Sequence, residues 1–461
     1  MFRILAYKSD SFSEINFTKS ESSKNFKTLL IGENGTGKTR LLNELISAVR
    51  SHHPSESSSR TKKFNYELAY LNESNKKILL NSNKAQEKTA IISNKVIAIS
   101  ASNNDKLPFS DSDKFFDKNY QYCGIRETSN ASWTSSLMRK TIENLLDCVS
   151  NNKIKPLSKI FSFLSFENII RIRFSLKKTT KLDLFNCKAE DLLEFIEHYS
   201  LNSRRMQVDL IREFDLKAAR NILSYFKDII LRVSDKEAYF EVNLLDDNYG
   251  FLKAYQNIDL LRRVGLISDV SLRLAKEGDK QDFTFMDASS GESQLLHSLS
   301  SFVRYVVDDS LVVIDEPEIS LHPNWQLKYI SLIDLLLTDL KGCHVVIATH
   351  SHFLVTDLKP EDSSLIVLEK DEKGIRATPI ESSTLGWSPE SVLYRVFNVR
   401  IINSVYLDSD LQKAHQLMSS DDIDFVELKK LMSKFESLVL DEKDPLKKFI
   451  GAMEDFIDER G

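Results

Sequence analysis

The stretch that decides the fold lies near the start of the chain and reads Gly32-Glu33-Asn34-Gly35-Thr36-Gly37-Lys38-Thr39. It fits the pattern G-x-x-x-x-G-K-[ST], whose glycines let backbone N–H groups turn toward phosphate oxygens. Apolar residues over 26–31 predict a buried strand before the loop, and apolar residues at helical spacing over 41–49 predict a helix after it. This order predicts an α/β domain that binds a nucleotide, with Lys38 at the β- and γ-phosphates and Thr39 on Mg²⁺. A glycine-rich turn without a ligand is the alternative.

Composition is that of an ordinary globular protein. The chain has 461 residues, of which 42% are apolar and 28% charged, and its formal net charge of −5 requires any nucleic-acid contact to be local. No apolar run predicts a membrane span, and the first residues lack the pattern of a signal peptide. Four cysteines without a C-x-x-C spacing predict reduced thiols rather than a zinc site. These features predict a cytoplasmic protein.

A second part of the nucleotide site is predicted far along the chain. Four apolar residues, 311–314, predict a buried strand that runs into Asp315 and Glu316. Such a strand end suits a carboxylate that holds Mg²⁺, and the following Glu is placed to orient or deprotonate the attacking water. A helix N-terminus on a solvated surface is the alternative for this pair taken alone. Because Lys38 and Asp315 have to meet in one domain, the long segment between them predicts an insert that splits it.

The pattern of apolar residues predicts four parts. They are an N-terminal lobe with the phosphate loop at 1–127, a mostly helical insert at 128–260, a C-terminal lobe at 261–388, and a helical segment at 389–461 that offers a candidate partner-binding surface. Further strands are expected at 95–100, 261–274 and 344–348, and helices at 206–233, 291–307 and 325–340.

Three further motifs resemble those of ABC-type ATPases. Ser289-Ser290-Gly291-Glu292 opens a helix and resembles the signature motif in the form found in SMC-like and OLD-like enzymes. Asp315-Glu316-Pro317-Glu318, followed by Ser-Leu-His-Pro at 320–323, resembles their Walker B motif and D-loop. Ala-Thr-His-Ser at 348–351 resembles the loop of the switch histidine, which is His350 here. The resemblance implies an ABC/SMC-type P-loop ATPase head that is split by the insert.

The resemblance also implies a mechanism that uses ATP and Mg²⁺. Heads of this type dimerise and sandwich two ATPs, so Ser289 and Gly291 of one subunit would face the γ-phosphate held by the other, and His350 would contact it in cis. Two departures stand out. Ala288 occupies a position that is usually Leu, and no Q-loop glutamine is identified, because Gln121 lies too far beyond the strand at 95–100.

The tail resembles one branch of the superfamily. Residues 387–392 (Trp-Ser-Pro-Glu-Ser-Val), 396–399 and 444–446 resemble the ATPase subunit of the Septu phage-defence system, and related ATPases accompany some retrons. This implies a separate HNH endonuclease as partner. Asp408-Ser409-Asp410 predicts solvated surface rather than the acidic cluster of an OLD nuclease. A non-hydrolysing ATP-sensing scaffold and an SMC-like DNA-repair ATPase remain as alternatives.

A local excess of basic residues between 151 and 182 leaves contact with DNA open. The same excess suits a solvated face on a packed element or a patch for an acidic partner, because the interleaved aromatic and branched residues have the spacing of a core. The basic residues are Lys153, Lys155, Lys159, Arg171, Arg173, Lys177, Lys178 and Lys181.

Overall fold

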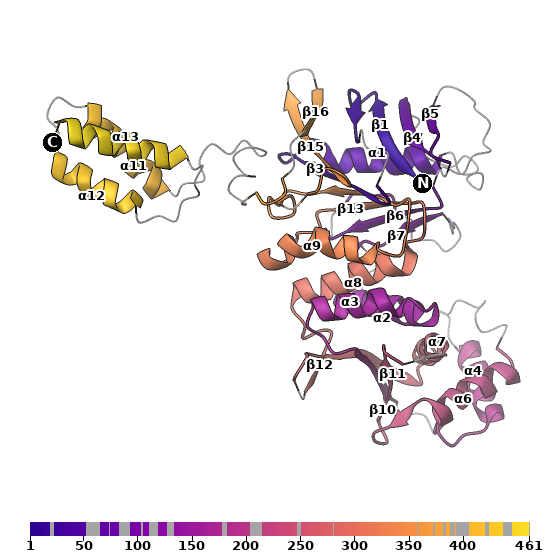
Figure 1. Ribbon diagram of the computed structural model, residues 1–461. Helices are drawn as coiled ribbons and strands as arrows, with labels where there is room; N and C mark the ends of the chain where they lie inside the picture. The colour runs from indigo at the N-terminus through magenta and orange to yellow at the C-terminus, as the bar shows by residue number, and fades with distance from the viewer. Residues whose placement is uncertain are drawn as a thin grey trace. The chain divides into compact units, whose positions relative to one another are not determined.

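The chain folds as two compact units, residues 1–387 and 388–461, which are described separately (Figure 1). The computed structural model describes residues 1–18, 23–51, 65–72, 74–82, 93–102, 105–109, 119–126, 133–177, 182–202, 214–246, 250–279, 281–356, 358–371, 374–380, 384–387, 392, 405–419, 424–436 and 445–460.

A seven-stranded sheet forms the centre of the first unit and positions the predicted site. Its strands run parallel except β16, which closes one edge in the antiparallel sense. In spatial order they are β16 (Gly374–Ile380), β15 (Ser363–Asp371), β3 (Phe26–Ile31), β14 (His344–Ala348), β13 (Ser310–Asp315), β6 (Lys95–Ser100) and β7 (Tyr120–Tyr122). The predicted α/β class is thereby confirmed, and so are the predicted strands at 26–31, 95–100 and 344–348.

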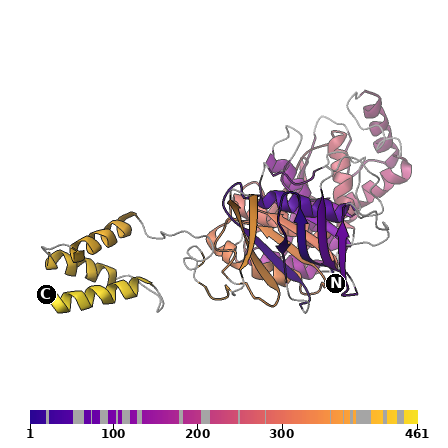
Figure 2. The same ribbon diagram turned by 90° about the horizontal axis from the view of Figure 1, so that it is seen from above.

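One face of this sheet is covered by α1 (Lys38–Arg50), which contacts β6, β13 and β14. A second, antiparallel sheet covers the other side of α1, so that the helix is enclosed between two sheets (Figures 1 and 2). The strands of that sheet, in spatial order, are β2 (Ile15–Asn16), β1 (Arg3–Ser9), β4 (Tyr66–Leu71) and β5 (Lys77–Asn81). A shared apolar core of both sheets and α1 fixes the start of the helix next to the phosphate loop.

The opposite face carries two layers of helices and a third sheet (Figure 1). The first layer holds α8 (Ser290–Tyr305) and α9 (Pro323–Leu336), and the second holds α2 (Trp133–Ser150) and α3 (Ile154–Phe163). The third sheet is antiparallel, in the order β12 (Asp282–Thr284), β11 (Ile267–Ala275), β8 (Ile169–Leu176), β10 (Glu237–Asn243) and β9 (Leu231–Arg232). The same region holds α4 (Ala189–Asn202), α6 (Leu216–Asp228) and α7 (Phe251–Arg263).

The insert differs from its prediction in two respects. β8, β9 and β10 lie inside the span 128–260 that we expected to be mostly helical, and they share a sheet with β11 and β12 beyond residue 260. Residues 261–263, expected in a strand, belong to α7. Of the helix expected at 206–233, the structure describes α6, while residues 203–213 lie outside the described residues. The signal for β8 was an alternation of period two, in which Ile170, Ile172 and Phe174 are buried between outward-facing arginines.

Several basic residues of 151–177 make contacts within the chain. Arg171 pairs with Glu241 and Asp282, and Arg173 pairs with Glu237, all on strands of the same sheet. The Lys153 ammonium donates to the carbonyls of Val303, Arg304 and Val306, where the last turn of α8 leaves carbonyls without helical partners. These contacts favour a face on packed elements over a phosphate-binding patch. Lys178 and Lys181 lie outside the described residues.

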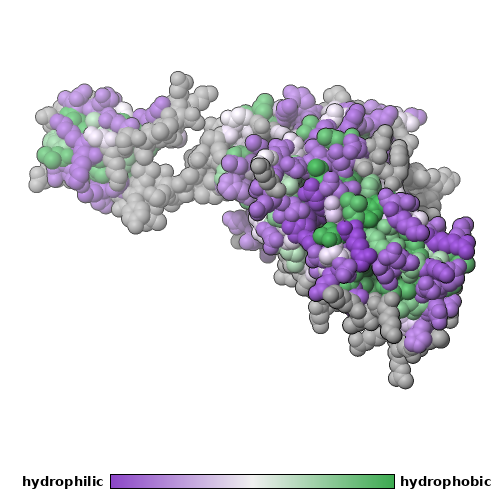
Figure 3. All heavy atoms as spheres, turned by 90° about the horizontal axis from the view of Figure 1, so that it is seen from below, coloured by the Kyte–Doolittle hydropathy of each residue, from purple (hydrophilic) through white to green (hydrophobic). Residues whose placement is uncertain are grey.

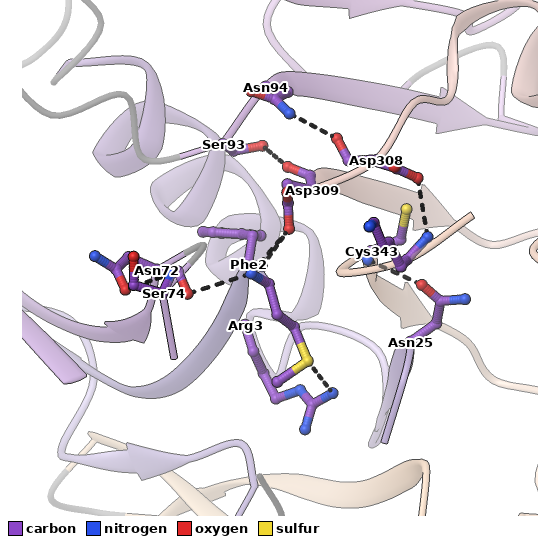
Figure 4. Close-up of polar contacts among 12 residues, drawn as sticks. Phe2, Arg3, Asn25, Asn72, Ser74, Ser93, Asn94, Asp308, Asp309 and Cys343 are labelled. Atoms are coloured by element: carbon purple, nitrogen blue, oxygen red, sulfur yellow. Dashed lines mark hydrogen bonds and ion pairs between the residues drawn. The ribbon is translucent and has the colours of Figure 1, made fainter. Parts of the chain in front are cut away.

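Polar contacts tie the amino ends of the central strands together (Figure 4). The Asp309 carboxylate accepts the backbone N–H of Phe2 at 2.8 Å, and the Asp309 carbonyl accepts the Ser93 hydroxyl at 2.9 Å. Asn94 donates to the Asp308 carbonyl at 3.0 Å, and Cys343 donates its backbone N–H to the side chain of Asn25 at 3.0 Å. These contacts therefore align the amino ends of strands that are far apart in sequence. The phosphate loop lies at the opposite, carboxyl ends of the strands.

The second unit is a set of three helices with its own apolar core. They are α11 (Val405–Ser419), α12 (Phe425–Glu436) and α13 (Pro445–Arg460), which confirms helical structure in the described part of this segment. The core residues are Ala414, Leu428, Leu431, Phe435, Met453 and Ile457. Asp408-Ser409-Asp410 lies in α11, whereas residues 393–404, which hold part of the tail resemblance, lie outside the described residues.

The described surface mixes polar and apolar areas (Figure 3). Large apolar side chains that remain exposed include Leu231, Val233 and Leu245. Within the described ranges, no helix combines the length and the hydropathy needed to cross a membrane.

Candidate nucleotide site

The phosphate loop takes a conformation that needs its glycines. Gly35 and Gly37 have φ values of 83° and 88°, in the left-handed region that side chains with a Cβ disfavour. Gly37 caps α1, and a Cβ at this position would lie only 2.6 Å from the Ile375 side chain. The backbone therefore curls from β3 into the N-terminus of α1, where unpaired N–H groups and the helix dipole favour an anion.

Lys38 folds into the loop that precedes it. Its ammonium donates to the backbone carbonyls of Gly32 at 2.8 Å and Glu33 at 3.0 Å, and its side chain is buried. Burial lowers the pKa of Lys38 to about 8, against the opposing effect of nearby carboxylates that include Glu316 and Asp315. The amine is thus held inside the loop, in position to contact the phosphates of a nucleotide.

The two predicted magnesium ligands meet directly. The Thr39 hydroxyl, in the first turn of α1, donates to the two carboxylate oxygens of Asp315 at 3.2 and 3.1 Å. Asp315 is 3% exposed, and burial raises its pKa to about 7, with further contributions from Glu316 and Asp105. A hydroxyl and a carboxylate are the hard oxygen ligands that Mg²⁺ takes, and a buried carboxylate gains from a nearby cation. This pair therefore fits a magnesium ion.

Glu316 and His350 lie beside this pair. The His350 Nε2 atom is 3.8 Å from Oε1 of Glu316, and the Glu316 N–H donates to the Ala348 carbonyl at 2.9 Å. Glu316 has a φ of 51°, an uncommon conformation for a non-glycine residue that turns the chain at the end of β13. Burial lowers the pKa of His350, and the charge of Lys38 lowers it further, so the imidazole is neutral at pH 7. A carboxylate and a neutral imidazole thus face the same space as Lys38.

The predicted signature motif begins α8 as expected. The Ser289 hydroxyl accepts the Glu292 N–H at 3.2 Å, and the Glu292 carboxylate accepts the Ser289 N–H at 2.9 Å, which forms a capping box. Glu292 also pairs with Lys276. Ser289 and Ser290 are exposed, and the hydrogen bonds described for residues 289–292 do not reach the phosphate loop. One chain thus brings together the phosphate loop, Asp315, Glu316 and His350, and no described hydrogen bond joins residues 289–292 to them.

The sequence leaves the Q-loop glutamine unassigned, and Gln121 is the residue weighed for that role. Gln121 lies on the edge strand β7 and donates to the Tyr122 carbonyl at 3.2 Å. Asp105, five positions after β6, is buried and accepts the Tyr122 hydroxyl at 2.5 Å. Its charge contributes to the raised pKa of Asp315. In the sequence, Asp105 was indicated only by its place shortly after the predicted strand at 95–100. The structure pairs that strand with β13, which carries Asp315.

Sequence reasoning also missed Gln294 in α8. Its side-chain amide donates to the Ala101 carbonyl at 3.3 Å and thereby joins the signature helix to the carboxyl end of β6. The residue directly follows the signature, but no local pattern indicates that its partner lies so far away in sequence.

Comparison with known proteins supports an ATPase-type core. Residues 153–356 match the family model described as "AAA domain, putative AbiEii toxin, Type IV TA system". This range includes the signature, Asp315, Glu316 and His350, while the phosphate loop precedes it. No curated protein matches the chain. The match covers less than half of the chain and is a similarity to that domain family.

Similar solved structures include SMC head domains. That of Thermotoga maritima is 11% identical, with a TM-score of 0.35 and coverage of 82% of this chain and 100% of that chain. The Pyrococcus furiosus head with an extended coiled coil, bound to the C-terminal domain of ScpA, is 9% identical, with a TM-score of 0.32 and coverage of 87% and 100%. The Pyrococcus yayanosii head is 9% identical, with a TM-score of 0.33 and the same coverage.

The raised pKa of Asp315 predicts how stability depends on pH. An unfolded Asp titrates near about 4, so folding takes up a proton between that pH and about 7, and stability falls as the pH rises through this range. Asp315→Asn removes this charge and keeps an acceptor for Thr39. We expect it to stabilise the nucleotide-free protein, by roughly 1–3 kcal/mol more at pH 8 than at pH 5. Denaturant unfolding of both proteins at the two pH values measures the difference, and a gain that does not change with pH would contradict the assignment.

Proposed function

We propose that this chain binds MgATP at the site between β3, β13 and β14 and hydrolyses it. The observation that carries the proposal is the direct contact of Thr39 with Asp315, because it joins the loop and the carboxylate that the reaction needs. The placement of Glu316 beside His350 adds the groups that act on the attacking water and on the γ-phosphate.

The proposed roles follow from the positions of the side chains. Loop N–H groups of 32–39 and the N-terminus of α1 hold the phosphates, and Lys38 neutralises charge on the β- and γ-oxygens. When bound between Thr39 and Asp315, Mg²⁺ supplies charge neutralisation to the phosphates. Glu316 takes the proton of the attacking water, and His350, as a neutral imidazole, donates a hydrogen bond to the γ-phosphate.

We extend the proposal to a homodimer of ATPase heads. Ser289 lies at the exposed N-terminus of α8, and none of its described hydrogen bonds is to the phosphate loop of its own chain, so it is available to a nucleotide held by a second chain. Gly291, which the resemblance assigns to the same contact, is buried against Ser320. In the proposed arrangement each ATP is covered by the signature of the partner copy. The dimer, or a higher oligomer built from it, then responds to nucleotide.

We further propose that the complex acts in anti-phage defence and controls a separate HNH DNA endonuclease. The resemblance of the tail to Septu ATPases supports this role, and an association with a retron is the alternative within the same class. The three-helix unit of residues 405–460 supports the location of the partner surface, because it has a core of its own and lies outside the ATPase core. Any contact with DNA is assigned to the complex rather than to the basic residues of α3 and β8.

Variants of the site test hydrolysis. Lys38→Ala should abolish ATP binding, because the loop loses the ammonium that faces the phosphates. Glu316→Gln should retain ATP binding but lower the turnover number by about 10²- to 10⁴-fold, since the amide cannot take a proton. Equilibrium binding of labelled ATP and steady-state phosphate release measure the two effects. ATP binding by the wild type without turnover would instead favour an ATP-sensing scaffold, and Glu316→Gln at the wild-type rate would exclude Glu316 as the base.

A mixing experiment tests the shared site. Lys38→Ala and Ser289→Arg chains should each be inactive, the first in its phosphate loop and the second in its signature. A mixed dimer retains one site made of an intact loop and an intact signature, so mixing the two chains should restore part of the ATPase activity. The control is each variant mixed with itself. If mixed dimers are demonstrated by differently tagged chains and no activity returns, the shared-site arrangement is wrong.

Removal of the second unit tests the partner surface. A chain ending at Trp387 should bind ATP as the full chain does, because the described site lies within residues 1–387. In a pull-down it should no longer retain the co-expressed HNH endonuclease proposed as its partner. Retention of the nuclease by the shortened chain would place the partner surface on the ATPase unit.

A further inference from the structure

Two segments that follow neighbouring strands are tied together next to Glu316. One is the turn of residues 317–322, which follows β13, and the other is the loop of residues 349–353, which follows β14. The Glu318 carboxylate accepts the backbone N–H of His350 through Oε1 at 2.6 Å. Its other oxygen, Oε2, is shielded from solvent and has no hydrogen-bond partner among the described residues. The backbone N–H of His350 therefore orients the Glu318 carboxylate.

Gln326 makes a second connection between the same segments. Its side-chain carbonyl accepts the Ser351 hydroxyl at 2.5 Å, and its amide donates to the Leu321 carbonyl at 2.9 Å. Ser351 in turn accepts the N–H of Phe353 at 3.1 Å. One side chain at the start of α9 thus bonds to the turn on one side and to the loop on the other.

The turn that carries Glu318 is itself held in place. The Leu321 N–H donates to the Glu318 carbonyl at 3.0 Å, and Ser320 has a φ of 64°, an uncommon conformation for a non-glycine residue. Gly291 of α8 packs against it so closely that a Cβ there would lie 2.5 Å from the Ser320 carbonyl oxygen and 3.2 Å from the Trp325 ring. The turn therefore has little freedom to move away from the loop.

We propose that Glu318 and Gln326 are positioning residues that hold the His350 loop so that its imidazole stays beside Glu316. Glu318 serves as a hydrogen-bond acceptor for a backbone N–H, and neither as a second base nor as a metal ligand. The geometry supports this division, because Oε1 is committed to His350 at 2.6 Å, while Asp315 is the carboxylate that meets Thr39. The inference rests on the proposed ATPase function for its kinetic effect, but the contact itself is independent of nucleotide.

Two substitutions of Glu318 distinguish its role as a hydrogen-bond acceptor from a role of its negative charge. Glu318→Gln keeps an oxygen that accepts the His350 N–H, whereas Glu318→Leu removes the acceptor at similar size. We expect Glu318→Gln to stay within about threefold of the wild-type turnover number and Glu318→Leu to lower it by about 10- to 100-fold with little change in KM, since a misplaced catalytic group mainly affects the reacting state. Gln326→Leu should lower it in the same direction, which provides a second variant if Glu318→Leu folds poorly.

A double-mutant cycle tests whether Glu318 acts through His350. Glu318→Leu should cause no further loss in a His350→Ala background, because a group that acts by placing the imidazole has nothing left to place. Hydrogen exchange of the full, nucleotide-free chain gives a reading without turnover. The His350 amide should exchange slowly in the wild type and in Glu318→Gln, and faster in Glu318→Leu.

Several outcomes would overturn the inference. Equal loss in Glu318→Gln and Glu318→Leu would make Glu318 a charged participant in the chemistry, and additive losses in the cycle would separate it from His350. If the His350 amide exchanges as slowly in Glu318→Leu as in the wild type, Glu318 does not hold the His350 loop. If the wild type does not hydrolyse ATP, the proposed function fails, and the exchange result alone decides whether Glu318 positions the loop.

Discussion

The site depends on the parallel register of four neighbouring strands. Ala348 at the end of β14 lies opposite Leu30 of β3 on one side and Asp315 of β13 on the other, and Asp315 lies opposite Ser100 of β6. The carboxyl ends of these strands are therefore level, so whatever follows each strand emerges at the same edge. The phosphate loop, Glu316 and His350 are the groups that follow, although most of the chain separates the first from the others.

The two edges of this sheet serve different purposes. At the amino ends, the side chains of Asp309, Ser93 and Asn25 bond to backbone groups and fix where strands begin. At the carboxyl ends, burial raises the pKa of Asp315 and lowers that of Lys38, so both charged forms are disfavoured by the protein itself. A cation beside Asp315 and phosphates beside Lys38 would relieve both effects, and ligand binding is then linked to stability.

The sequence predicted those parts of the site whose signal is local. The phosphate loop, the strand before Asp315 and the cap of α8 each depend on residues within one turn or strand, and the structure has them where the sequence places them. The sheet of the insert was missed because β8 obtains its partners from β10 and β11, far along the chain, and its alternating pattern was hidden among helical neighbours. The partners of Arg171 and Lys153 were missed for the same reason, and their charges were left open to another interpretation.

The turn of residues 317–322 shows what a local pattern cannot contain. As sequence it resembles the continuation of a Walker B motif, but in space it contacts α8 through Gly291 and the His350 loop through Glu318. α8 in turn packs against α2 and α3, and its capping Glu292 pairs with Lys276 at the end of β11. The insert and the His350 loop are therefore connected through one helix and one turn. Since closely packed elements resist continuous deformation, a displacement of the insert would be passed to the His350 loop through these contacts.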